Sequence, residues 1–245
     1  MKAGRFVTSG PVRFVARIPA GSVDVETGDS AEATVTVEAL NEPARKQLDD
    51  LPIELSNGEL VVGVEERMSF RIFGRTPAFR VVVRVPHDSG LHVSTVSADV
   101  QARGRYSGAE VKTVSGEVDV AEVTGDANVK SVSGDVRFGN VAGQVAVNSV
   151  SGDVEVGEAA RGANVKTVSG DQSVGSVTEG TAELQSVSGD IRVGIRRGSG
   201  AWMDCRSTSG STVSELEDAD GPPADGPLVE VRAKAVSGDI RVGRA

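Results

Sequence analysis

The pentapeptide Val132-Ser133-Gly134-Asp135-Val136 recurs 18 residues later as Val150-Ser151-Gly152-Asp153-Val154. Its third residue, a glycine in most copies, recurs at positions 98 (alanine), 116, 134, 152, 170, 189, 210 and 238, in steps of 18, 18, 18, 18, 19, 21 and 28. Four identical steps indicate a repeat architecture. The other copies are Val96–Val100, Val114–Val118, Val168–Asp171, Val187–Ile191, the degenerate Thr208–Ser211, and Val236–Ile240.

A nine-residue pattern lies within each repeat. Between Val111 and Ala182, apolar residues favour block positions 1, 4 and 8, and glycine favours position 6. Apolar residues two apart, such as Val136 and Phe138, share one side of a strand. No apolar stripe follows the 3.6-residue helical period. The pattern therefore predicts short strands separated by tight turns.

Short strands of this kind bury an apolar column only when they stack on one another. The sequence thus predicts an all-β parallel β-solenoid, a β-helix or β-roll, of about 18 residues per coil, with each coil advancing about 4.8 Å. A flattened two-sided section and a triangular section both close at 18 residues, and the nine-residue pattern favours two sides.

The rest of the chain predicts a cap and an insertion. Residues 1–93 lack the motif and form a β-rich N-terminal capping segment, with one short helix starting near Asn41. Residues 94–245 form the regular solenoid, interrupted by an acidic, Pro/Gly-rich loop at 213–228. We expect the last copy, at residues 236–240, to form a nearly uncapped end that can pair with another chain.

A structural turn ladder is the predicted role of the repeated Gly-Asp pair. Gly152 is expected to hold a backbone conformation unfavourable to residues with a Cβ. The ladder comprises Gly116, Gly134, Gly152, Gly170, Gly189, Gly238, Asp135, Asp153, Asp171, Asp190 and Asp239. We expect these acids, with Glu117, to accept turn N–H bonds near Lys112, Lys130 and Lys166. A calcium roll is the alternative, but its motif places the acid two residues before the apolar position and has more glycines. No metal or cofactor is predicted.

A hydroxyl ladder accompanies the turns. We expect the motif valines to point inward, with both flanking hydroxyls facing outward. The pairs are Thr113 and Ser115, Ser131 and Ser133, Ser149 and Ser151, Thr167 and Ser169, and Ser186 and Ser188. Structural stacking is the favoured interpretation, and an ice-binding face is the alternative.

Composition excludes several classes. The net charge of −9 argues against a nucleic-acid partner. No apolar run approaches the ~20 residues of a membrane span. Because the residues after Met1 lack an apolar leader, we expect a cytoplasmic location. The single cysteine, Cys205, cannot form an internal disulfide. His87 and His92 are the only histidines, and no catalytic triad or phosphate loop is found, so the chain is predicted not to be an enzyme.

The iterated T/S-V-S-G-D-V motif resembles a bacterial "putative adhesin" β-strand-repeat family of unknown function. The resemblance covers residues 80–245 and extends more loosely to the N-terminal strands, where Val85-Pro86-His87 resembles the lead-in to the first repeat. It implies a β-strand-repeat fold and supplies no catalytic or ligand residues. We predict a non-enzymatic scaffold or interaction protein that binds a protein partner or self-associates through solenoid ends as a homo-oligomer. Alternatives are an adhesin-like or envelope-stress surface-binding module, a calcium-binding roll and a carbohydrate-active enzyme.

Overall fold

The chain folds as an all-β solenoid. The computed structural model describes residues 1–63, 76–216 and 226–245, and the chain forms two compact units, residues 1–121 and 122–245. The fold class predicted from the repeat is therefore confirmed. The predicted segment boundary at 93/94 falls within one long strand, β7 (Ser89–Lys112), whereas the two compact units meet at 121/122 in the sequence.

The second unit is built from two parallel ladders of strands, so each coil has two sides. Ladder A runs in the order β9 (Ala127–Lys130), β11 (Val145–Asn148), β13 (Gly162–Ser169), β15 (Gly180–Ser188), β19 (Leu228–Ser237) and β17 (Gly200–Ser209). Ladder B runs in the order β10 (Val136–Val141), β12 (Val154–Ala159), β14 (Gln172–Val177), β16 (Ile191–Ile195), β20 (Ile240–Arg244) and β18 (Thr212–Ser214). In the first coils of this unit, paired residues are 18 positions apart in the sequence, as the repeat predicts: Val147 pairs with Val129 on one side and with Val165 on the other.

The core consists of columns of inward side chains from the two ladders. The column at Val165 is typical, because its members pair in register from coil to coil and are fully buried. Stacking like side chains at the strand spacing removes each of them from water without requiring large residues. In ladder B a polar residue takes a place in an apolar column: Gln172 lies between Val154 and Ile191 and is 1% exposed.

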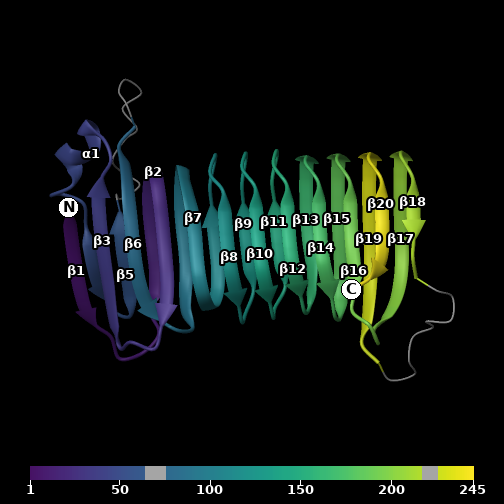
Figure 1. Ribbon diagram of the computed structural model, residues 1–245, viewed down its shortest axis with the longest axis horizontal. Helices are drawn as coiled ribbons and strands as arrows, with labels where there is room; N and C mark the ends of the chain where they lie inside the picture. Colours follow the sequence, from purple (N-terminus) through teal and green to yellow (C-terminus); the bar gives the residue numbers. More distant parts are fainter. Residues whose placement is uncertain (64–75, 217–225) are drawn as a thin grey trace. The chain divides into compact units, whose positions relative to one another are not determined.

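The coils at one end do not follow sequence order. β19 pairs with β15 on one edge and with β17 on the other, and β20 lies in the same way between β16 and β18. Figure 1 shows the C-terminal strands, drawn in yellow, between coils that precede them in the sequence. The prediction that the coil at residues 236–240 forms the end is wrong. The terminal coil is β17–β18, which carries the degenerate copy of the motif.

The first unit mixes parallel and antiparallel pairs. Its long strand β2 (Arg13–Gly28) pairs in parallel with β7 on one edge, and with β5 (Glu59–Gly63) and then β6 (Ala78–Pro86) on the other. The antiparallel pairs join β3 (Glu32–Ala39) to β6 and to β1 (Lys2–Val7), and β4 (Ile53–Ser56) to β5. β8 (Val118–Val123) follows β7 along the chain.

The short helix α1 (Glu42–Gln47) lies where the sequence predicts one. The side chain of Asn41 accepts a hydrogen bond from the backbone N–H of Ala44 at 3.0 Å, and Pro43 occupies the first turn. Both features favour helix initiation. The centre of the predicted acidic loop, 217–225, lies outside the described residues.

Candidate functional site

The turn glycines occupy a backbone conformation that residues with a Cβ rarely adopt. Gly134, Gly152, Gly170, Gly189 and Gly238 have φ angles between +117° and +141°. Each of the last four also lies directly over the carbonyl of the matching glycine in the preceding coil, where a Cβ would clash. Gly116 differs, because its φ is not positive and only the close approach to the backbone of Ala98 restricts it.

The aspartates of the ladder hydrogen-bond from one coil to the next. Asp153 Oδ1 accepts the backbone N–H of Asp171 at 2.8 Å, and its neighbours repeat the contact. In the same way, at 2.8–3.0 Å, Oδ1 of Asp135 accepts from the N–H of Asp153, Asp171 from Asp190, Asp190 from Asp239, Asp239 from Ser211 and, in the first unit, Asp99 from Glu117. Three of these aspartates also pair through Oδ2 with the arginine two residues later: Asp135 with Arg137, Asp190 with Arg192 and Asp239 with Arg241.

This arrangement uses the carboxylates as backbone acceptors. One oxygen of each satisfies a turn N–H, and each coil is thereby fixed to the next by a charge-assisted bond. Among the described residues there is no group of three or more His, Cys, Asp or Glu side chains placed to hold a metal ion.

The motif valines point outward, which contradicts the prediction that they face the core. Val132, Val150, Val168, Val187 and Val236 are 47–52% exposed, and we call this column the valine ridge. The preceding hydroxyl residues Ser131, Ser149, Thr167 and Ser186 are buried instead. The reason is the strand alternation, which starts from a buried apolar residue three residues before each ridge valine, such as Val165 before Val168 and Leu184 before Val187.

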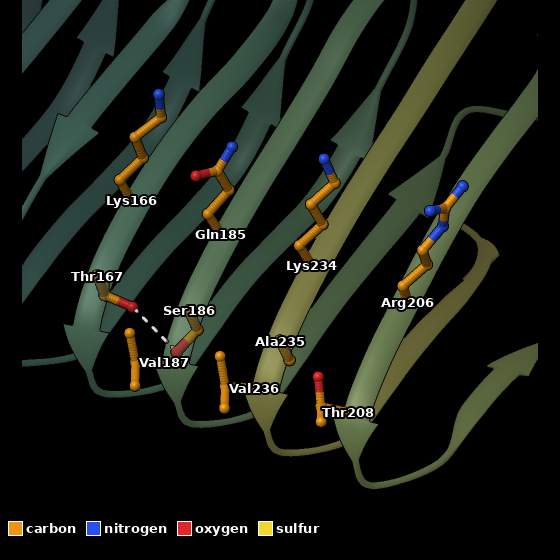
Figure 2. Close-up of a pocket in the computed structure, with 10 residues that line it drawn as sticks. All are labelled: Lys166, Thr167, Gln185, Ser186, Val187, Arg206, Thr208, Lys234, Ala235 and Val236. Atoms are coloured by element: carbon orange, nitrogen blue, oxygen red, sulfur yellow. Dashed lines mark hydrogen bonds between the residues drawn. The ribbon is translucent and has the colours of Figure 1, made fainter.

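A row of polar and basic side chains runs beside the valine ridge. The basic row consists of Lys130, Asn148, Lys166, Gln185, Lys234 and Arg206, one from each successive strand of ladder A. A groove of about 390 Å³ separates the row from the ridge over the last four strands, and Thr167 and Ser186 lie in its floor. Figure 2 shows the part of this surface that lines the groove, with Lys166, Gln185, Lys234 and Arg206 of the row on one side and Val187 and Val236 of the ridge on the other.

The terminal strand β17 presents apolar side chains and an open edge. Trp202 and Met203 are 50% and 38% exposed, and Leu228 of the adjoining strand is 50% exposed. Within the described part of the chain, β17 and β18 each pair on one edge only. Burial, the largest effect, raises the pKa of the Cys205 thiol on this strand, so the thiol is a weak nucleophile at neutral pH.

The two histidines lie in the first unit and make structural contacts. His87 Nδ1 is 2.9 Å from Thr27 Oγ1, and His92 Nδ1 is 3.1 Å from Glu110 Oε2. Lys112 lies 2.7 Å from the same carboxylate and, through a hydrogen bond, holds the pKa of Glu110 below its usual value.

Of the features described above, sequence reasoning missed the valine ridge, the groove and the open edge at β17. Strand alternation counted from the buried Val165 would have shown that the ridge faces outward. The sequence signal for the terminal coil is Ser211, which occupies the position where the other copies of the motif have an acid. In the last coil an acid at this position would have no further turn N–H to accept. No helix among the described residues is long and apolar enough to span a membrane.

The fold and the repeat place the chain among known proteins. A putative adhesin from Bacteroides fragilis superposes with a TM-score of 0.52 at 14% identity, covering 98% of this chain and 96% of that one. A "putative lipid binding protein" from Parabacteroides distasonis is 12% identical with a TM-score of 0.40 over 98% and 96% of the two chains. A comparison with curated proteins gives no match. The profile of the Toastrack DUF4097 family matches residues 17–243, and the chain therefore belongs to that family, as its motif predicts.

Proposed function

We propose that this protein is a non-enzymatic scaffold that associates with a second copy of itself through the edge of β17. The observation that carries the proposal is the open edge of the terminal coil. A strand edge presents a row of N–H and C=O groups that readily accept another strand. β17 carries no proline and no inward-facing charge, since its inward positions are Ala201, Met203, Cys205 and Ser207.

The edge strand of the first unit provides the contrast. β1 pairs, among the described residues, only with β3. Its Lys2 lies opposite the buried Val37, and the ammonium donates to the carbonyls of Asp49 and Leu51 at 2.7 and 2.8 Å. An inward lysine is a common device that prevents edge-to-edge pairing. The chain therefore blocks one edge strand and leaves β17 available.

Two copies that meet through the same strand form a closed, two-fold pair. Such a pair covers Met203 and the half-exposed Trp202 on both copies, and continues each ladder into its partner. Because the contact uses the same surface twice, association stops at the dimer. The predicted mass limit is twice the chain mass of 25.2 kDa.

The test is the solution mass by light scattering over a hundredfold concentration range. The wild type should rise from the monomer mass to twice that value, and the emission of Trp202, the only tryptophan, should shift to shorter wavelength in parallel. Met203→Lys should remain monomeric, because its ammonium reaches water in the monomer and is buried in the pair. Val82→Lys, at a 40% exposed position on the doubly paired β6, is the matched control and should dimerise normally.

Two outcomes would overturn the proposal. One is a wild-type mass of 25.2 kDa at every concentration. The other is an equal loss of dimer in both lysine variants, which would place the contact elsewhere. Circular dichroism verifies that both variants keep the β-sheet signal of the wild type.

A further inference from the structure

The basic row has a regular chemical alternation. Along consecutive coils it reads Lys130, Asn148, Lys166, Gln185, Lys234, with Arg206 on the terminal strand. Adjacent strands lie about 4.8 Å apart, so the lysines recur at about twice that spacing. An amide side chain, which both donates and accepts hydrogen bonds, stands between each pair of lysines.

The lysines of this row are free although the chain carries nine excess negative charges. Lys130, Lys166 and Lys234 are exposed and form no ion pair with any described residue. Arg206 alone is neutralised, by Asp204 at 2.9 Å. Glu183, the acid nearest to Gln185 on this face, accepts a hydrogen bond from Gln185 Nε2 at 2.7 Å.

The turn ladder explains why these cations lack partners. Asp171 and Asp190 follow the glycine turn, and their Oδ1 atoms accept backbone N–H groups of the next coil. Oδ2 of Asp190 lies 3.6 Å from Arg192. Asp171, the acid nearest in sequence to Lys166, is therefore engaged within the ladder, and Glu230, the acid nearest to Lys234, pairs with Arg232 at 2.7 Å. Lys166 and Lys234 thus line the groove without an acidic partner among the described residues.

We infer that this groove binds a linear acidic polysaccharide that carries a carboxylate on alternate sugars. Each sugar ring advances such a polymer by about one strand spacing, so its carboxylates recur at the spacing of Lys166 and Lys234. The intervening sugar offers hydroxyls to Gln185. The valine ridge and the floor between it and the row supply an apolar wall for the C–H faces of the rings.

Other partners fit the same surface less well. Nucleic acid carries a charge every ~1.7 Å of duplex and is strongly repelled by an acidic protein, whereas a polymer charged on alternate sugars is repelled less. A peptide that binds by adding a strand needs a free strand edge, but β13, β15 and β19 are paired on both edges. A membrane surface favours protruding aromatic or leucine side chains, and the ridge beside the groove carries only valines and Thr208.

The test measures fluorescence anisotropy of a labelled decasaccharide of alternating glucuronate and N-acetylglucosamine. The wild type should bind it saturably at low salt and lose it at high salt, and should not bind a neutral dextran oligosaccharide of the same length. Lys166→Gln/Lys234→Gln should weaken binding about tenfold, since each exposed ion pair contributes up to about fivefold in affinity. Arg45→Gln/Lys46→Gln, on exposed positions of α1, removes the same charge and should leave binding unchanged.

A third variant tests the apolar wall. Val187→Ser replaces a half-exposed ridge residue, so the fold tolerates it, and the loss of apolar surface without a change in charge should weaken binding. The inference is overturned if the decasaccharide does not bind, if the two double variants lose equal affinity, or if only vesicles of phosphatidylcholine and phosphatidylglycerol bind. Because Lys166, Val187 and Lys234 are outward-facing residues of β13, β15 and β19 and none of them lies on the edge strand β17, dimerisation through β17 is expected to persist in these variants, and the two proposals can fail separately.

Discussion

Replacing Gly152 with alanine should destabilise the solenoid far more than replacing Gly198. Both glycines have positive φ angles, +117° and +90°, so alanine is strained at each by about 1–2 kcal/mol. They differ in what a Cβ would meet. At Gly198 nothing lies within 4 Å, whereas at Gly152 a Cβ would clash with the carbonyl oxygen of Gly134 and lie 2.7 Å from its carbonyl carbon.

The clash at Gly152 involves backbone of the adjacent coil, which cannot rotate away as a side chain can. Separating the two coils strains packed strands and adds about 1–3 kcal/mol, the usual cost of overpacking. We expect a loss of about 2–5 kcal/mol for Gly152→Ala and about 1–2 kcal/mol for Gly198→Ala. The difference between them isolates the contribution of the coil-to-coil approach.

Urea unfolding followed by far-ultraviolet circular dichroism measures both losses. The midpoint should fall more for Gly152→Ala, with an unchanged dependence of unfolding free energy on urea. Equal losses in the two variants would refute the reasoning, because strain at positive φ would then account for everything. The close stacking of turn glycines would have no energetic role.

Two further predictions concern buried polar groups. Gln172→Val should lower stability by about 1 kcal/mol. Its Nε2 donates two hydrogen bonds at 2.7 Å, to Thr167 Oγ1 and to the Gln185 carbonyl, and their loss outweighs the removal of an Oε1 atom that has no partner among the described residues. Exposed Gln144→Val is the control, and a higher urea midpoint for Gln172→Val would contradict the argument. Burial raises the pKa of Tyr106 well above its ordinary value of 10.0, and the charge of Glu26 adds to the effect. Because the pKa of Tyr106 is higher in the folded state, the stabilisation by the protonated side chain is complete below pH 10 and is lost as the pH rises further. Tyr106→Phe removes the 3.0 Å hydrogen bond to the Val25 carbonyl and should therefore lower the free energy of unfolding by about 1 kcal/mol at pH 7. The difference between the variant and the wild type should become progressively smaller above pH 10. Absorbance at 295 nm follows this single tyrosine, and titration near pH 10 in the folded protein would show the prediction to be wrong.

The repeat could be predicted from sequence because every coil encodes its own strands. An 18-residue step and a period of two within each strand are local properties of the sequence. They were sufficient to predict the solenoid and its turns, and the repeated motif indicated the family. The order of the coils is not local. β19 can pair with β15 or β17 in the same register, since the inward residues of all three strands alternate alike.

The N-terminal unit was harder to predict for another physical reason. Its strands do not repeat, so nothing in Glu32–Ala39 specifies whether it continues a parallel coil or turns back. The structure shows that it turns back, pairing antiparallel with both β1 and β6. The cytoplasmic location stays a prediction.

The direction of the aspartate ladder connects the degenerate coil to the open edge. The hydrogen bonds of the ladder all have the same direction: the N–H of Asp239 donates to Asp190, and the N–H of Ser211 in the next coil donates to Asp239. The coil that carries Ser211 in place of the acid is the one at which this series of hydrogen bonds ends, and the last coil in the sequence, β19–β20, pairs between it and β15–β16. A coil that only closed the solenoid would carry inward charge, as β1 does at Lys2. β17 instead presents Met203 and Cys205 at inward positions, which is the composition of a surface that another strand covers.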